Sequence, residues 1–171
     1  MKTKVIVSAC LLGENCKYSG GNNYNPDVAR LADKFELIPV CPEVFGGLDT
    51  PRPPSEIVGD RVISKTGDDV TCQYHDGAEK TLYIARENNC PVALLKERSP
   101  SCGCSKIYDG TFSGTLVDGM ELPHSFCLIM ILQCLAKVIL TNLLICIILL
   151  IDNIGLLFYN VLTLFRFFRF Y

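Results

Sequence analysis

The chain has 171 residues, with 16 Lys and Arg, 18 Asp and Glu, and ten cysteines. At roughly 100–200 residues per domain, this length fits one domain or at most two. The formal net charge of −2 excludes the broad basic surface with which nucleic-acid-binding proteins neutralise phosphates, so we expect no nucleic-acid partner.

The first predicted element is a β-strand at residues 5–7, which are Val-Ile-Val. Two lysines before it and Cys10 after it superficially resemble a lipoprotein export signal. The apolar run is, however, shorter than the ~7–15 residues that such a signal needs. We therefore expect a cytoplasmic location, where the reducing environment disfavours disulfides. The cysteines are then core thiols, reactive thiols or metal ligands.

Helices and strands alternate along the chain that follows. Asn25 is placed to cap a helix and Pro26 to occupy its first position. In chain order the sequence predicts a helix over residues 26–35, a strand over 37–40, a hairpin of 57–58 with 61–63, a helix over 75–89 and a strand over 91–95. This alternation predicts the α/β class, with a Rossmann-like parallel sheet, helices on both of its faces and a small hairpin.

Four cysteines follow the predicted strands. They are Cys10 and Cys16 after the first strand, Cys41 after the second and Cys102 after the third. Because ligands of open α/β sheets bind at the carboxyl ends of the strands, we expect these thiols to converge on one site. Of the other cysteines, five are interpreted as small hydrophobic residues of the core or tail: Cys72, Cys90, Cys127, Cys134 and Cys146.

A cysteine set with almost no histidine suits zinc or an iron–sulfur cluster. Structural zinc sites use closely spaced cysteine pairs, whereas five residues separate Cys10 from Cys16 and the other two are remote. The wide spacing therefore favours the larger cluster, with inert thiols as the alternative.

Polar side chains accompany these cysteines. Glu43 follows Cys41, and Ser99 and Ser101 precede Cys102. Beside a metal, the carboxylate is a candidate general base, and the hydroxyls are candidate proton relays or substrate anchors. The plain alternatives are a solvated loop carboxylate and a turn. Arg52, which lies between prolines, is interpreted as an anion anchor or an ordinary surface arginine.

Several short motifs, taken together in this order, resemble a bacterial family first catalogued as domain of unknown function 523, whose known activity is thiouracil desulfidation. The motifs are Ser8-Ala9-Cys10-Leu11-Leu12-Gly13, Asn15-Cys16-Lys17-Tyr18, Pro39-Val40-Cys41-Pro42-Glu43, Gly46-Gly47-Leu48 with Pro51-Arg52, Leu95-Lys96, Ser99-Pro100-Ser101-Cys102-Gly103 and Ile107-Tyr108-Asp109-Gly110-Thr111-Phe112. They span residues 5–118.

The resemblance implies a [4Fe–4S] cluster that is held by three cysteines and leaves one iron open. The expected ligands are Cys10, Cys16 and Cys102, with Cys41 as the alternative ligand or a catalytic thiol; Cys104 is expected to vary and receives no role. The thiocarbonyl sulfur of 2-thiouracil would bind the open iron, and uracil and hydrosulfide would form without net redox change.

For the polar residues, the resemblance implies that Glu43 moves protons with the help of Ser99 or Ser101. A domain that binds zinc or a cluster without catalysis, tethered to a membrane by the C-terminal part, is the alternative. The sequence indicates no oligomeric state.

The C-terminal part differs from residues 1–120, which form the expected cysteine-rich domain. The family pattern stops after Asp118, and a one-nucleotide shift near residues 119–124 could restore it, so residues 121–171 are either a hydrophobic helical tail or a frameshift product. Residues 126–151 contain one charge and exceed the ~20 residues that span a bilayer. Membrane contact is therefore expected through residues 126–165 if the tail is genuine.

Overall fold

The computed structural model describes residues 1–103, 106–118 and the backbone of 156–157. The predicted membrane span at residues 126–151, the three tail cysteines and Cys104 lie outside the described residues. Among the helices of the described part, none is long and apolar enough to cross a membrane.

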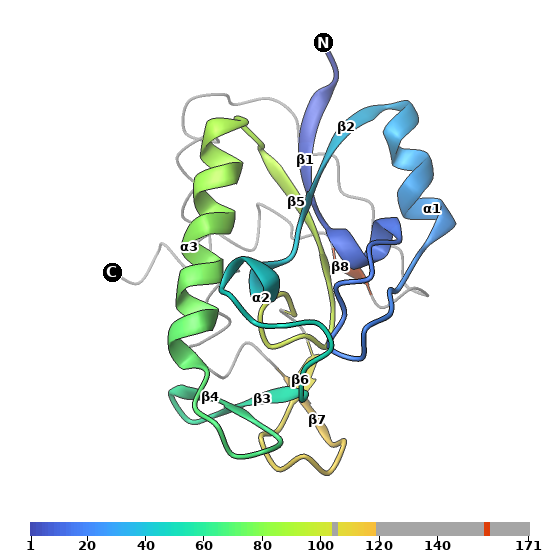
Figure 1. The fold of residues 1–171 in the computed structure, drawn as a ribbon. Helices are drawn as coiled ribbons and strands as arrows, with labels where there is room; N and C mark the ends of the chain where they lie inside the picture. The colour runs from blue at the N-terminus through green and yellow to red at the C-terminus, as the bar shows by residue number, and fades with distance from the viewer. Residues whose placement is uncertain (104–105, 119–155, 158–171) are drawn as a thin grey trace, which may run out of the picture.

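A parallel sheet forms the centre of the fold (Figure 1). Its parallel strands are β1 (Thr3–Ser8), β2 (Phe35–Val40) and β5 (Val92–Lys96), with β1 in the middle. The two-residue strand β8 (Leu156–Leu157) pairs antiparallel with β5. The predicted parallel arrangement is confirmed. Strands β1 and β2 are longer than the predicted 5–7 and 37–40, and β5 is shifted by one residue from the predicted 91–95.

Helical segments cover both faces of this sheet, as predicted (Figure 1). The long helix α3 (Thr71–Glu87) covers one face, where Ile6 packs with Ala78 and Ala85. The short helix α1 (Pro26–Ala29) covers the other, where Val28 packs with Val5 and Val7. Since neighbouring residues of β1 face opposite sides and both sides are covered, the strand is a continuous apolar run rather than an alternating one.

The helix bounds differ from the predicted ones. The helix predicted over residues 26–35 is α-helical only through Ala29, continues as the 3₁₀ turn η2 (Arg30–Asp33), and gives way to β2. Helix α3 begins four residues earlier than predicted, where Asp69 accepts hydrogen bonds from the amide and hydroxyl of Thr71. Cys90 is buried, but Cys72 is exposed on α3, so its interpretation as a core thiol was wrong.

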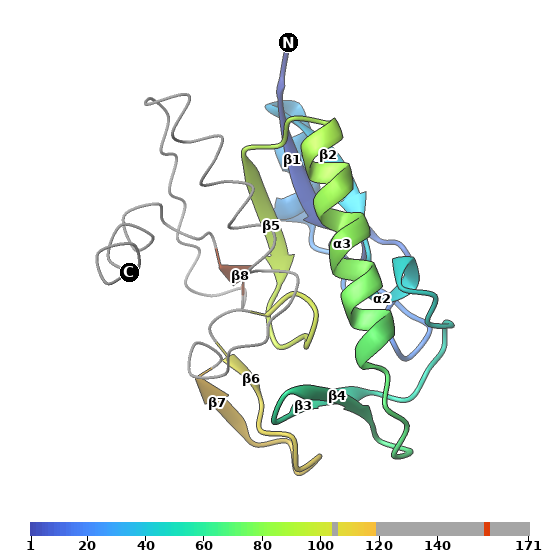
Figure 2. The ribbon, with the colours of Figure 1, turned by 90° about the vertical axis from the view of Figure 1, so that its left-hand side faces the viewer.

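Two hairpins lie past the carboxyl ends of the parallel strands (Figure 2). The predicted hairpin is confirmed as β3 (Ser55–Val58) paired with β4 (Arg61–Ser64). The second, β6 (Lys106–Tyr108) with β7 (Leu116–Asp118), was not predicted, because three-residue strands carry too little periodicity. Ile107 of β6 is buried with Ile57, Val62 and Tyr74, and so joins the two hairpins to α3.

A close crossing of two helices places Glu43. Helix α2 (Pro42–Phe45) follows β2, and the 3₁₀ turn η1 (Ala9–Leu12) follows β1. Neither element was predicted from the sequence. Where α2 meets α3, a Cβ atom on Gly77 would lie 1.9 Å from the carbonyl oxygen of Pro42. The two backbones therefore touch, which fixes the first turn of α2 against the molecule's longest described helix.

We expect Gly77→Ala to lower the free energy of unfolding by about 1–3 kcal/mol, because the added methyl group overpacks this contact. Alanine is the better helix former, so any measured loss reports the clash. Urea unfolding followed by circular dichroism measures it. Gly21→Ala is the control, because its Cβ would meet only the Ser19 hydroxyl at 4.0 Å. Equal stability of the two variants would contradict the close crossing.

Candidate active site at the carboxyl ends of the parallel strands

The four cysteines that follow the strands line one cavity of about 460 Å³. Cys10 lies in η1 directly after β1, Cys41 between β2 and α2, and Cys102 in the turn after β5. Cys16 comes from the loop that follows η1 and folds back, with the Asn23 amide donating to the Cys10 carbonyl oxygen at 2.9 Å. The predicted convergence of these thiols is therefore present.

The thiols of Cys10, Cys16 and Cys41 affect one another's pKa. The Cys41 thiol donates to the carbonyl oxygen of Cys16 at 3.8 Å. Hydrogen bonding by the neighbouring Cys16 thiol lowers the pKa of Cys10 to about 6 and also lowers the pKa of Cys41, while the pKa of Cys16 is raised. Since Cys16 has one S–H, it stabilises one thiolate at a time.

Cys102 lies in a different environment. Burial raises the pKa of its thiol to about 12, although the hydroxyls of Ser101 and Ser8 oppose this at 3.5 and 3.6 Å from Sγ. Ser8 is itself held by the backbone amide of Lys96, which donates to its Oγ at 2.9 Å. Burial therefore disfavours the thiolate of Cys102, and a bound metal cation would favour it.

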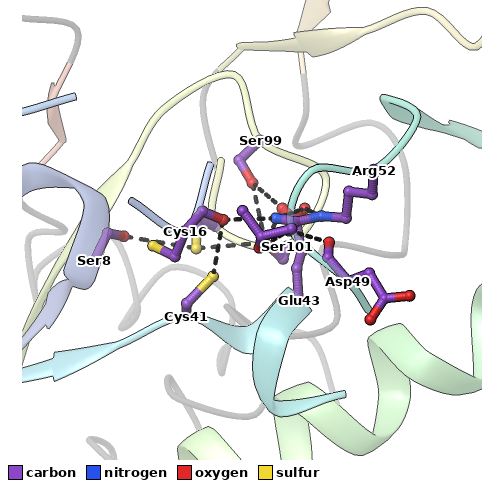
Figure 3. A network of polar contacts seen from close by, with 10 residues as sticks. Ser8, Cys16, Cys41, Glu43, Asp49, Arg52, Ser99 and Ser101 are labelled. Carbon is purple, nitrogen blue, oxygen red and sulfur yellow. Dashed lines mark hydrogen bonds and ion pairs between the residues drawn. The ribbon is translucent and has the colours of Figure 1, made fainter. Parts of the chain in front are cut away.

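Glu43 lies at the centre of a polar network that also contains both predicted serines (Figure 3). Its Oε1 accepts hydrogen bonds from Ser99 at 3.2 Å and Ser101 at 3.0 Å, and the two hydroxyls lie 3.0 Å apart. The interpretation of Glu43 as a solvated loop carboxylate was wrong, because its side chain is only 14% exposed. The tertiary structure thus joins the carboxylate to the hydroxyl that reaches Cys102.

Arg52 holds the other oxygen of this carboxylate. Its Nε and Nη2 donate to Oε2 of Glu43 at 2.9 and 2.7 Å. Nη2 also donates to the carbonyl oxygen of Cys16 at 3.0 Å, and Nη1 donates to the Asp49 carbonyl oxygen and the Thr50 hydroxyl. Burial by itself acts to lower the pKa of Arg52, but Glu43 outweighs it and the pKa is raised.

Both sequence interpretations of Arg52 were therefore wrong. Its side chain is 7% exposed, and all five guanidinium N–H groups donate to described protein atoms. No N–H remains for an anionic ligand, and the residue is not on the surface. Arg52 instead joins the loop of Cys16 to the carboxylate of α2.

Other residues of the cavity wall were not singled out from the sequence. The family motifs contain Ser8, Lys96 and Phe112, so membership of a motif could have identified these residues. Glu56 and Tyr74 lie at ordinary strand and helix positions that no spacing distinguishes. Among the described residues, no three His, Cys, Asp or Glu side chains are arranged to hold a single metal ion, as the zinc alternative requires.

Comparisons with known proteins agree with the family motifs. The 2-thiouracil desulfurase family matches residues 5–131, a segment that continues past Asp118. "Uncharacterized protein YbbK" of Bacillus subtilis (strain 168) is 41% identical over 125 residues, which are 67% of this chain and 83% of YbbK. A solved structure of the [4Fe-4S]-dependent thiouracil desulfidase TudS has a TM-score of 0.70 and 36% identity, and covers 84% of this chain and 100% of TudS.

We expect Arg52→Met to lower the free energy of unfolding by about 3–5 kcal/mol, because it leaves the Glu43 carboxylate buried without its partner. Urea unfolding measures the loss. Arg30→Met is the matched control: it removes an ion pair to Asp27 whose side chains are 75% and 57% exposed, and should cost about 1 kcal/mol or less. Similar losses in both variants would contradict a structural role for the buried pair.

Proposed function

Because the chain belongs to the 2-thiouracil desulfurase family, we propose that it converts thiolated pyrimidines such as 2-thiouracil to the oxygen compound and hydrosulfide. The observation that carries this proposal is the chain of contacts from Glu43 through Ser101 to the Cys102 sulfur in the cysteine-lined cavity. A buried acid–base group next to sulfur ligands suits hydrolysis of a C=S bond. Water supplies the new carbonyl oxygen, one of its protons leaves with the sulfur as hydrosulfide and the other is released, so no oxidant or reductant is needed.

The cofactor is a [4Fe–4S] cluster, as in the similar desulfidase TudS. The donor set fits this group, because four cysteines line the cavity and iron–sulfur clusters are held by cysteine thiolates. We assign Cys10, Cys16 and Cys102 as ligands, with Cys41 as the alternative ligand or a catalytic thiol. Three ligands leave one iron open, and this iron would serve as a Lewis acid for the thiocarbonyl sulfur.

The two oxygens of Glu43 have different roles in this proposal. Oε2 is fixed by two N–H groups of Arg52 and cannot approach a substrate. Oε1 accepts hydrogen bonds from the hydroxyls of Ser99 and Ser101, and hydroxyls can exchange protons with it. Oε1 is therefore the atom that takes a proton from the attacking water.

Ser101 would return a proton toward the sulfur. Its hydroxyl lies 3.0 Å from Oε1 of Glu43 and 3.5 Å from Sγ of Cys102, but its single hydrogen can serve one of them at a time. When Oγ of Ser101 accepts the proton from Glu43 and gives up its own hydrogen on the other side, one proton passes from the carboxylate to the sulfur-lined side of the cavity. Ser99 hydrogen-bonds both Glu43 and Ser101 and keeps them aligned.

We expect Glu43→Gln to lower the rate of uracil and hydrosulfide formation from 2-thiouracil by about 100-fold or more, since the amide cannot accept the proton. Iron and sulfide content should not change. Anaerobic assays with the reconstituted full chain measure both quantities. Glu36→Gln, on an exposed side chain of β2, is the control and should keep full activity. Unchanged turnover in Glu43→Gln would reject the assigned base.

The ligand assignment predicts the result of single Cys→Ser substitutions. Iron and acid-labile sulfide should fall to background in the Cys10, Cys16 and Cys102 variants, because each loses a thiolate ligand. The Cys41 variant should keep its cluster, as should the control Cys72→Ser, whose thiol is exposed on α3. If Cys41→Ser loses the cluster and one of the other three keeps it, Cys41 replaces that residue as a ligand.

A further inference from the structure

The turn between β6 and β7 brings an aromatic residue, Phe112, to the cavity wall in an uncommon backbone conformation. Phe112 has φ of 57°, in the left-handed region that bulky residues rarely adopt. Phe112 lines the same cavity as the four cysteines and is only half-buried. Such a conformation persists when surrounding contacts hold it, and it is often found at ligand sites.

Contacts with β3 hold this conformation. The backbone N–H of Phe112 donates to Oε2 of Glu56 at 2.9 Å, and Glu56 is only 7% exposed. Two residues earlier, a Cβ atom on Gly110 would lie 2.5 Å from the Ile57 carbonyl oxygen, so the turn backbone rests directly on β3. A carboxylate buried on a strand thus serves to fix one amide of a neighbouring turn.

Side chains within the turn restrict it further. Oδ1 of Asp109 accepts hydrogen bonds from both the amide and the hydroxyl of Thr111. Beyond Phe112, the Thr111 hydroxyl donates to the Ser113 hydroxyl at 2.8 Å. The Ser113 hydroxyl in turn lies 2.7 Å from the hydroxyl of Thr115. The backbone position of Phe112 is therefore set by the protein itself, before any ligand binds.

We propose that the Phe112 ring is the surface on which the pyrimidine ring of the substrate stacks, and that Glu56 is the positioning residue that holds it there. This inference rests on the proposed function and names how the substrate ring is recognised. A pyrimidine is planar, and an aromatic side chain offers it a flat face whose interaction does not depend on which ring atom carries the sulfur. A ring fixed in advance also loses little conformational entropy on binding.

The test measures uracil binding to the cluster-loaded full chain by titration calorimetry, because uracil has the ring but no sulfur. Phe112→Ala should weaken binding by about 5- to 100-fold, and Phe112→Tyr should stay within about twofold of the parent. Tyr83→Ala, an exposed aromatic of α3, is the control and should bind normally. Normal binding by Phe112→Ala, or no uracil binding by the parent protein, would overturn the proposal.

A second set of variants separates stacking from folding. Phe112→Asn keeps a residue that tolerates the left-handed region, so its melting temperature should not fall while uracil binding weakens as in the alanine variant. Glu56→Ala should also weaken binding, and Glu56→Gln should restore it, since the amide oxygen accepts the same N–H. If Phe112→Asn binds uracil normally, or Glu56→Gln fails like Glu56→Ala, the assigned role is wrong.

Turnover of 2-thiouracil on the same samples distinguishes the two proposals. A parent protein that binds uracil but releases no hydrosulfide would reject the desulfidase function, while the Phe112 variants would still decide the stacking role. Normal turnover together with unaffected binding in Phe112→Ala would reject the stacking role and leave the function in place.

Discussion

The buried ion pair between Arg52 and Glu43 is the interaction on which the rest of the site depends. The side chains are 7% and 14% exposed, so neither charge can be solvated by water in place of the other. Arg52 also donates to the carbonyl oxygen of Cys16, which ties the cysteine-bearing loop to the helix that carries the carboxylate. One guanidinium therefore sets the distance between the proposed acid–base group and the sulfurs.

This pair also explains how a carboxylate, the proposed base, is accommodated in so enclosed a place. Arg52 supplies the compensating charge through Oε2 and leaves Oε1 to the hydroxyls of Ser99 and Ser101. The backbone contact of Gly77 with Pro42 also fixes this helix against α3. Packing and charge together thus determine the orientation of the carboxylate. The hydroxyls of Ser99 and Ser101 are the groups that can exchange protons with it.

Sequence patterns predicted the elements whose signal is local. The apolar runs of the three parallel strands, the hairpin of residues 57–58 with 61–63 and the Asn25-Pro26 helix start all appear where expected. Short segments were missed: α2 and the β6–β7 hairpin are too brief to show a period, and their positions depend on contacts with α3 and β3. Cys72 was misplaced because an isolated cysteine carries no information about which helix face it occupies.

By itself the sequence determined the α/β class, the family and the set of candidate side chains: four cysteines at strand ends, Glu43 and two serines. These follow from periodicity, strand order and motifs, which are properties of neighbouring residues. Only the tertiary structure decided how Arg52 is used and that Glu56 holds the turn of Phe112, since both contacts join segments far apart in the chain. Such contacts depend on the packing of whole elements, and no local pattern encodes them.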